Sequence, residues 1–201
     1  MNQITIKSPA KVNLYLEVKD LRQDEYHNID TVFQKITLYD EITLSERTKG
    51  IRLICDNKDV PVNHCNLAYK AIRLLNGVVK GLPGIEISIK KIIPVAGGLG
   101  GGSSNAASVL LGLKKLWQIK VSQKRLMELG RVLGADVPFF ISGFGTAVGR
   151  ERGDRLTPIA NNLSFWLVLV NPGIKISTKE VYNSLKIGLT KDRGGDKIIS
   201  H

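Results

Sequence analysis

Residues 94–107 read Pro94-Val95-Ala96-Gly97-Gly98-Leu99-Gly100-Gly101-Gly102-Ser103-Ser104-Asn105-Ala106-Ala107, and this glycine-rich stretch decides the fold. Isoleucines alternate with polar residues over 85–89, which predicts a half-buried strand, and a helical pattern runs on to about Leu116. The predicted order is strand, glycine loop, helix. Five glycines in six positions let the backbone come close to a ligand, and the unpaired N–H groups of the helix N-terminus attract anions. We therefore expect a phosphate to bind there.

Ser103 and Ser104 are candidates for the N-cap of this helix, and their hydroxyls could also bind phosphate oxygens or join the shell of a Mg²⁺ ion. Two familiar phosphate loops do not fit. No Gly-Lys-Ser/Thr follows the glycines, and their spacing matches a dinucleotide fingerprint poorly, with no βαβ unit after it. A plain flexible turn is the alternative interpretation of such a loop.

The spacing from Pro94 through Gly98-Leu99-Gly100-Gly101-Gly102-Ser103-Ser104 closely resembles the ATP loop of the GHMP kinases, which include galactose, homoserine, mevalonate and phosphomevalonate kinases. The likeness is strongest to the branch that phosphorylates a hydroxyl of a cytidine-diphosphate-linked sugar alcohol in isoprenoid precursor synthesis. It implies ATP as cofactor and places Asn66, a plausible helix N-cap, beside the adenine. Lys91 matches a lysine near the nucleotide, although a solvated surface charge explains it equally well. The implied ATP-binding residues are Asn66, Lys91, Pro94, Gly97, Gly98, Leu99, Gly100, Gly101, Gly102, Ser103 and Ser104.

Two further segments carry the candidate catalytic residues. Ser8-Pro9-Ala10-Lys11-Val12-Asn13-Leu14 alone predicts a strand whose lysine reaches the surface. Gly134-Ala135-Asp136-Val137-Pro138 alone fits a helix cap and, equally well, a buried aspartate that needs a cationic partner, for which Lys11 is the candidate. Both segments resemble motifs of the same kinases, and the resemblance implies that Lys11 and Asp136 are catalytic.

Tyr26 and His27 lie in the polar segment 22–29, which on its own indicates no particular function. In the family, a matching tyrosine stacks on the cytosine of the substrate and the following histidine forms a hydrogen bond with it, and stacking of an aromatic ring on a base is favourable. Glu25 and Glu151 stand where family members usually have glycine. The implied substrate-binding residues are Asn13, Tyr26, His27, Asp136 and Thr178.

The composition is that of a soluble globular protein: 201 residues, 43% hydrophobic and 23% charged. The N-terminus lacks the apolar run of a signal peptide and no long apolar stretch predicts a membrane span, so we expect a cytoplasmic protein without membrane partners. The net charge of +11 favours anionic partners, but the basic residues are spread over the whole length, which argues against nucleic acid. Cys55 and Cys65 have no metal-ligand spacing, so we expect free thiols and no protein-bound metal centre.

The resemblance implies an α+β fold, with a ribosomal-protein-like mixed sheet and helices in an N-terminal ATP-binding domain over 1–155. Residues 156–201 would begin a ferredoxin-like C-terminal domain and stop before completing it. Ser8-Pro9 is expected to break the first strand, and Gly134 is expected to end a helix begun at Ser122. Local patterns predict strands over 4–7, 10–18, 31–36, 40–44, 51–55 and 165–170, helices over 66–75, 122–133 and 176–182, and a frayed tail over 186–201.

The expected activity is ATP-dependent phosphoryl transfer to a hydroxyl of the cytidine-linked substrate, with Mg²⁺ as a second cofactor. Asp136 would accept the hydroxyl proton or orient the oxygen, while Lys11 would keep Asp136 ionised. Two alternatives stay open: another small-molecule kinase of the family, against which Tyr26-His27 argues, and an inactive basic module that binds nucleotide or RNA. We expect a monomer or a weak homodimer.

Overall fold

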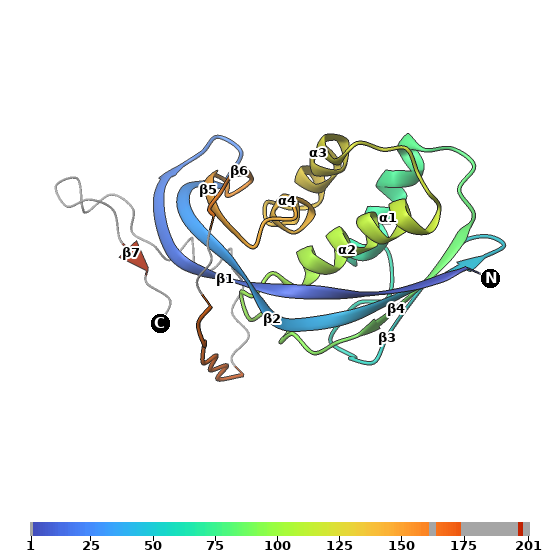
Figure 1. Cartoon of the computed structure of the whole chain (residues 1–201), viewed down its shortest axis with the longest axis horizontal. Helices are drawn as coiled ribbons and strands as arrows, with labels where there is room; N and C mark the ends of the chain where they lie inside the picture. The colour runs from blue at the N-terminus through green and yellow to red at the C-terminus, as the bar shows by residue number, and fades with distance from the viewer. Residues whose placement is uncertain (1, 161–163, 174–196, 199–201) are drawn as a thin grey trace.

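The computed structural model describes residues 2–160, 164–173 and 197–198. One curved sheet has the strand order β3-β4-β2-β1-β7, and β5 pairs with both β2 and β6. All pairs are antiparallel except β3 with β4, so the sheet is mixed, as expected. Four helices lie together against one face of this sheet (Figure 1). The elements are β1 (Gln3–Leu21), β2 (His27–Arg47), β3 (Ile51–Cys55), α1 (Leu67–Val78), β4 (Gly84–Lys90), α2 (Gly101–Leu116), α3 (Gln123–Leu133), α4 (Val137–Ile141), β5 (Thr146–Glu151), β6 (Arg155–Pro158) and β7 (Lys197–Ile198).

The expected break at Ser8-Pro9 is wrong: β1 runs through it and only changes its register with β2 between Pro9 and Lys11. A bulge of this kind accommodates proline, which has no N–H to give to the ladder. The two predicted strands over 31–36 and 40–44 are likewise one continuous strand, β2. β1 and β2 therefore form one long two-stranded ribbon at the centre of the sheet.

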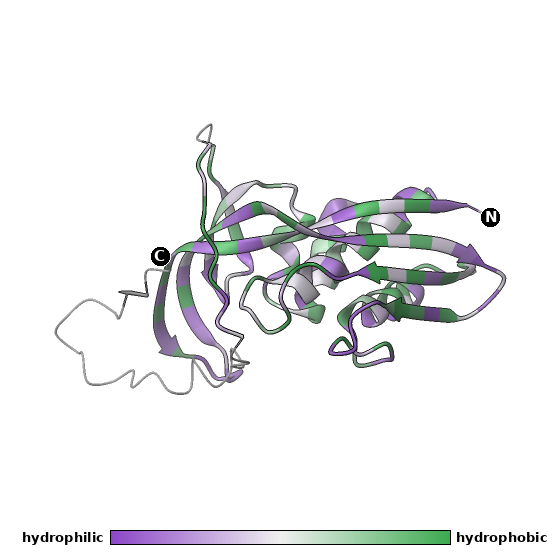
Figure 2. Ribbon diagram, turned by 90° about the horizontal axis from the view of Figure 1, so that it is seen from below, coloured by the Kyte–Doolittle hydropathy of each residue, from purple (hydrophilic) through white to green (hydrophobic). Residues whose placement is uncertain are grey.

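The core lies between the sheet and the helices. Ile85, Ile87 and Ile89 alternate inward along β4, as the sequence pattern predicts, and Figure 2 shows the same alternation of hydrophobic and hydrophilic residues along the strands. Helix α2 lies directly on β1 and β2 because Gly112 has no side chain. A Cβ at Gly112 would come within 2.3 Å of Ile6 Cδ1 and 2.6 Å of Leu44 Cδ1.

The predicted ends of two helices are confirmed. Asn66 caps α1 by accepting a hydrogen bond from the Ala68 N–H, and Ser122 caps α3 through the Arg125 N–H. Gly134 follows the end of α3 at the expected place. These caps supply partners for backbone groups that a helix leaves unsatisfied.

The apolar segment 165–170 does not form the predicted strand. Its side chains are exposed, and Trp166 is 100% exposed. A strand needs the hydrogen bonds of a neighbour, and none of the described strands pairs with this segment. The predicted helix over 176–182 lies outside the described residues.

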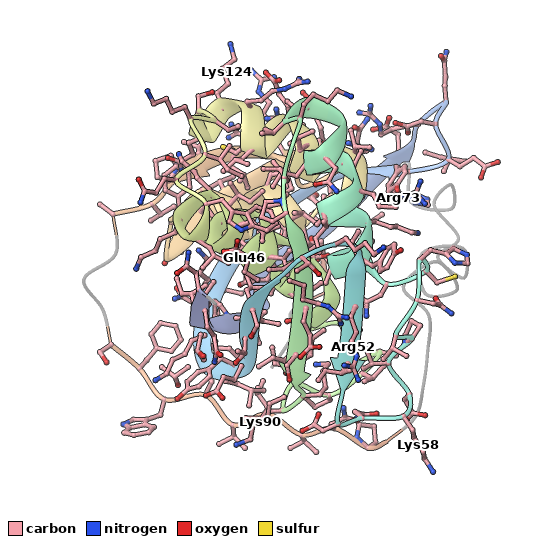
Figure 3. The ribbon with its side chains drawn as sticks, turned by 90° about the vertical axis from the view of Figure 1, so that its right-hand side faces the viewer. Glu46, Arg52, Lys58, Arg73, Lys90 and Lys124 are labelled. Atoms are coloured by element: carbon pink, nitrogen blue, oxygen red, sulfur yellow. The ribbon has the colours of Figure 1, made fainter. Side chains whose placement is uncertain are left out.

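Charged side chains are dispersed over the surface. Figure 3 shows Lys58 and Lys124 extending outward at opposite ends of the molecule, while Arg52, Arg73 and Lys90 lie on other exposed parts of that side. This dispersion agrees with the spread of basic residues along the sequence. No helix among the described residues is long and apolar enough to cross a membrane.

Candidate active site

The candidate residues gather around one open cavity of about 1580 Å³. Pockets for a single drug-sized ligand usually measure about 300–1,000 Å³, so this cavity has room for two small molecules. The glycine loop lines one part of it and the turn between β1 and β2 lines another. Of the residues implied by resemblance, those lining the cavity are Lys11, Asn13, Tyr26, His27, Asn66, Lys91, Pro94, Gly97, Gly98, Leu99, Gly100, Gly101, Gly102, Ser103 and Asp136.

The glycine loop ends where α2 begins, and Gly100 occupies the N-cap position with φ +69°. A Cβ at Gly100 would lie 3.0 Å from Phe140 Cζ and 3.1 Å from Lys11 Cγ, so this position requires glycine for its space as well as its conformation. Gly98 has the same φ but open space around it. The backbone at the start of α2 therefore packs tightly against Lys11 and α4 while its cavity side stays accessible.

Neither serine caps α2, because the helix begins at Gly101 and both lie within its first turn. Ser103 lines the cavity, as expected of a phosphate contact. Ser104 does not, since its side chain is fully buried and its hydroxyl lies 2.8 Å from Ser8 Oγ on β1. Ser8 Oγ is also 2.8 Å from Asn105 Oδ1, so these side chains fasten the start of α2 to the sheet.

Lys91 is neither a solvated charge nor a side chain free to reach a nucleotide. Its Nζ lies 2.9 Å from Oδ2 of Asp40, and both side chains are buried. Asp40 also accepts hydrogen bonds from the N–H groups of Ile92 and Ile93, at 2.7 and 2.8 Å. A Cβ at Gly101 would approach Lys91 Nζ to 3.2 Å, which places this ion pair directly behind the glycine loop.

Asp40 was not predicted as a buried partner of Lys91, although the alternation of residues along β2 indicates that its side chain points inward. The residues of β2 alternate between its faces, so Asp40 has the same orientation as the fully buried Ile42 and Leu44. An aspartate at an inward position of a strand needs a buried cationic partner. Lys91 supplies that partner here.

The expected contact between Lys11 and Asp136 is present, with 3.7 Å between Nζ and Oδ2. The Lys11 side chain is only 8% exposed, whereas Asp136 is 31% exposed toward the cavity. Asp136 does occupy the N-cap position of α4, as the helix-cap interpretation expects, but its side chain forms no capping hydrogen bond there. A buried ammonium beside a half-exposed carboxylate leaves that carboxylate able to meet a ligand.

The sheet holds Lys11 in this position. Its backbone N–H donates to the Leu99 carbonyl at 3.0 Å, next to the bulge of β1, and so ties the glycine loop to the strand. Its Nζ donates to Asn13 Oδ1 at 2.6 Å, and Asn13 Nδ2 in turn donates to Thr31 Oγ1 at 2.6 Å. Thr31 was not predicted as part of the site, and only the pairing of β1 with β2 brings it there.

Tyr26 and His27 lie where the turn after β1 leads into β2, and both line the cavity. Glu25 has φ +62°, a left-handed conformation that glycine adopts without strain. Hydrogen bonds offset this strain: the Arg22 N–H donates to the Tyr26 carbonyl at 2.7 Å, and Asp24 Oδ1 accepts from Arg22 Nε at 3.1 Å. The same Arg22 contact lowers the pKa of the Asp24 carboxyl.

Arg152 also lines this part of the cavity and was not predicted from the sequence. Its guanidinium lies 4.9 Å from the centroid of the Tyr26 ring, and its Nη2 lies 2.8 Å from Oδ2 of the buried Asp154. That hydrogen bond raises the pKa of Arg152.

Two expected contacts remain to be placed. Asn66 borders the cavity, but its Oδ1 accepts from the Ala68 N–H at 2.8 Å and its Nδ2 donates to the Pro61 carbonyl at 2.7 Å, so both ends of its amide are engaged. Thr178 lies outside the described residues.

Comparisons with known proteins all identify kinases as similar to this chain. A family model described as the GHMP kinases N terminal domain matches residues 66–144. The proteins named 4-diphosphocytidyl-2-C-methyl-D-erythritol kinase from Geobacter metallireducens and Syntrophus aciditrophicus are 47% and 43% identical to this chain, over 98% and 94% of its length. A solved structure titled as a crystal structure of 4-(cytidine 5'-diphospho)-2C-methyl-D-erythritol kinase is 40% identical, with a TM-score of 0.68 over 78% of the chain.

The chain is shorter than these relatives. It spans 70% and 67% of the two sequences and 55% of the solved structure. The segments that carry the glycine loop, the Lys11–Asp136 pair and Tyr26 all lie within residues 2–160, which the structure describes.

Proposed function

This chain belongs to the 4-diphosphocytidyl-2-C-methyl-D-erythritol kinases, a family within the GHMP kinases, and we propose that it transfers the γ-phosphoryl group of ATP to the 2-hydroxyl of 4-diphosphocytidyl-2-C-methyl-D-erythritol. This reaction serves the non-mevalonate route to isoprenoid precursors. The observation that carries the proposal is the Lys11–Asp136 pair, which lines the same cavity as the glycine loop and Tyr26.

Asp136 accepts the proton of the substrate hydroxyl. The hydroxyl oxygen then forms a bond to the γ-phosphorus as the bond to the oxygen bridging the β and γ phosphorus atoms breaks, and ADP leaves. Lys11 orients the Asp136 carboxylate through their ion pair and offsets the negative charge that develops on the transferred group. Positioning and electrostatic stabilisation supply most of the catalysis in phosphoryl transfer.

The glycine loop and the first turn of α2 hold the triphosphate. Their backbone N–H groups and the positive end of the helix favour a multiply charged anion, and the glycines allow close approach. Ser103 adds a hydroxyl on the cavity side. Lys91 acts from behind the loop, where its pairing with Asp40 fixes the backbone that receives the phosphates.

Mg²⁺ supports phosphoryl transfer by neutralising charge on the phosphate oxygens. Among the described residues, no three His, Cys, Asp or Glu side chains come together in a way that could hold a metal ion. Mg²⁺ commonly binds through substrate phosphates, water and one or two side chains, and the hydroxyl of Ser103, which lines the cavity, would fit that role.

Tyr26 and His27 recognise the cytosine. Tyr26 is 47% exposed at the cavity and offers a ring on which the base stacks, while His27 forms a hydrogen bond with the edge of the base. Asn13, which accepts a hydrogen bond from Lys11 and lines the same cavity, contacts the sugar alcohol.

Two measurements on this chain test the proposal. Calorimetric titration should show separate binding of ATP and of the cytidine substrate, and an assay of ADP release should show turnover only when both are present. The uridine counterpart of the substrate, a matched control, should bind more weakly because the polar partner at the base edge is then left unpaired. Binding of single-stranded RNA in place of both small molecules would favour the inactive module, and turnover with an unrelated alcohol would favour another kinase of the family.

A further inference from the structure

Arg152 lies in the turn between β5 and β6, far from Tyr26 in sequence but beside it in the fold. The pairing of β5 with β2 sets Ile29 opposite Glu151, which brings this turn next to the turn that carries Tyr26. The guanidinium then covers the Tyr26 ring at 4.9 Å from its centroid. The two turns therefore contact each other through a cation and an aromatic ring.

Arg152 is not free to leave this position. Its side chain is 21% exposed, and it donates to Oδ2 of Asp154, which is itself 8% exposed. Arg131 of α3 lies 3.8 Å from the same Asp154 oxygen, so the carboxylate is held from a second element. A guanidinium with a buried counterion keeps its orientation better than one on an exposed surface, where such pairs contribute little.

The contact leaves Tyr26 with one covered face. An exposed tyrosine would otherwise sample several side-chain rotamers, and a ligand that stacks on it would have to order the ring at a cost in entropy. With Arg152 over the ring, the ring is held in place, and because Tyr26 is still 47% exposed it keeps surface for a second flat group. A guanidinium above the ring also adds a favourable cation–π interaction.

We propose that Arg152 is a positioning residue that holds the Tyr26 ring ready to stack on the base of the cytidine substrate, with Asp154 fixing Arg152. This inference rests on the proposed function. Arg152 acts through Tyr26, so its removal weakens binding of the cytidine substrate only when Tyr26 is present.

A double-mutant cycle tests this dependence. Arg152→Leu should weaken binding of the cytidine substrate by about 2- to 30-fold, the range of a cation–π contact, and leave ATP binding unchanged. In a Tyr26→Ala background the same change should have less than about a 2-fold further effect. Arg152→Lys should restore part of the affinity, because a cation again lies over the ring.

Arg150→Leu is the matched control. It removes a guanidinium from the same hairpin, but Arg150 is 62% exposed and does not line the cavity. The affinity of Arg150→Leu for the cytidine substrate should stay within about 2-fold of that of the unmodified chain. This limit equals the smallest loss expected for Arg152→Leu. An equal loss in the two leucine variants would overturn the proposal, since hairpin charge alone would then explain it.

The remaining outcomes are equally decisive. If Arg152→Leu weakens binding of the cytidine substrate as much in the Tyr26→Ala background as in the unmodified chain, Arg152 contacts the ligand directly and the proposal is overturned. If Arg152→Leu does not weaken binding in either background, Arg152 has no role in it. The ring signals of ¹³C-labelled tyrosine, assigned with Tyr26→Phe, should shift in Arg152→Leu and not in Arg150→Leu, and an unchanged spectrum would overturn the proposal without any ligand. Failure of the unmodified chain to bind the cytidine substrate would instead overturn the proposed function.

Discussion

The two ends of the cavity are built in different ways. At the glycine-loop end, buried contacts fix the backbone: Lys11 binds Leu99 through main-chain atoms, Ser8 binds Ser104, and Asp40 pairs with Lys91. At the Tyr26 end, two surface turns meet through side chains. Glu25 in the first turn has φ +62°, and Glu151, the last residue of β5 before the second turn, has φ +59°, so each adopts a conformation that favours glycine.

This difference predicts which end tolerates change. Breaking a buried hydrogen-bonded ion pair costs several kcal/mol, whereas exposed pairs contribute about 0–1 kcal/mol. Substitutions at the glycine-loop end should therefore damage folding and ATP binding together. Substitutions of Tyr26, which is 47% exposed, should alter recognition of the base and leave the fold intact, so specificity can change at that side chain, whereas the largely buried Arg152–Asp154 pair is less tolerant.

The largest effect is expected at Asp136, which lines the same cavity as both ends. Asp136→Asn keeps the shape of the side chain but cannot accept a proton, so the rate of phosphoryl transfer should fall by about 10²–10⁴-fold while ATP affinity stays within a few-fold. Steady-state assays and titration with ATP measure the two quantities. Near-normal turnover in this variant would remove Asp136 from the mechanism.

A comparison of Gly100→Ala with Gly98→Ala tests the glycine-loop end. Both residues have φ +69°, so both variants carry the strain of a left-handed alanine, about 1–2 kcal/mol. Only the Cβ at Gly100 meets Phe140 and Lys11, which adds roughly 1–3 kcal/mol of overpacking. Chemical denaturation should rank Gly100→Ala as the less stable variant by that margin, and equal losses would show that the packing of the loop is not critical.

Tyr26→Ala tests the other end. We expect binding of the cytidine substrate to weaken by about 1–3 kcal/mol, the scale of stacking between a base and an aromatic ring, with ATP binding unchanged. Tyr26→Phe is the control and should be mild, and His27→Ala should reduce discrimination between the cytidine and uridine ligands. If the two alanine variants weaken ATP and cytidine binding alike, the turn supports the whole cavity and the contrast between the two ends fails.

A smaller, pH-dependent effect is expected at Lys35, whose Nζ lies 5.3 Å from the centroid of the Phe139 ring of α4. Burial lowers the pKa of Lys35, so the unfolded chain binds more protons than the folded one below the ordinary lysine pKa of 10.5. The contribution of Lys35 to stability should thus rise as pH increases toward that value, by less than about 1.4 kcal/mol per pH unit. Denaturation of Lys35→Met between pH 7 and pH 10 should lack this rise and show higher stability at pH 7.

The smallest expected effect is at Glu25. Glu25→Gly relieves a left-handed glutamate but adds backbone freedom to the unfolded chain, so the net gain in stability should be below about 1 kcal/mol. Glu25→Ala retains the strain and should show no gain in the same denaturation experiment. A loss of stability in the glycine variant would mean that the glutamate side chain contributes more than its backbone strain costs.

Local patterns in the sequence were sufficient to predict the elements that are determined by residues close together in the chain. The alternation over 85–89, the Asn66 cap and the Ser122–Gly134 helix depend on residues close together in the chain, and all are present. Pro9 misled the prediction because a bulge paired with β2 absorbs it. Residues 165–170 misled it because an apolar run does not by itself supply a pairing partner.

Predicting the site residues required the family resemblance, and their final contacts depend on segments that are far apart in the sequence. The Lys11–Asp136 pair was expected because both motifs resembled one family, although a buried aspartate already required a cation. The orientation of Ser104 depends on Ser8, and that of Lys91 on Asp40, each from a distant segment. Arg152 reaches Tyr26 only through the pairing of β5 with β2, which no local pattern indicated.

The bond between Lys11 and the glycine loop has a consequence for the order of events during synthesis. Lys11 precedes its hydrogen-bond partner Leu99 by 88 residues, a stretch that takes roughly 4–18 s to synthesise at the usual rates of elongation. The β1–β2 ribbon can pair early, but Ile42 and Leu44, fully buried in the finished fold, stay uncovered until α2 has been made. The nascent chain therefore exposes one apolar face of the β1–β2 ribbon for several seconds. The yield of folded protein should depend on how well chaperones protect that face from aggregation while the rest of the chain is translated.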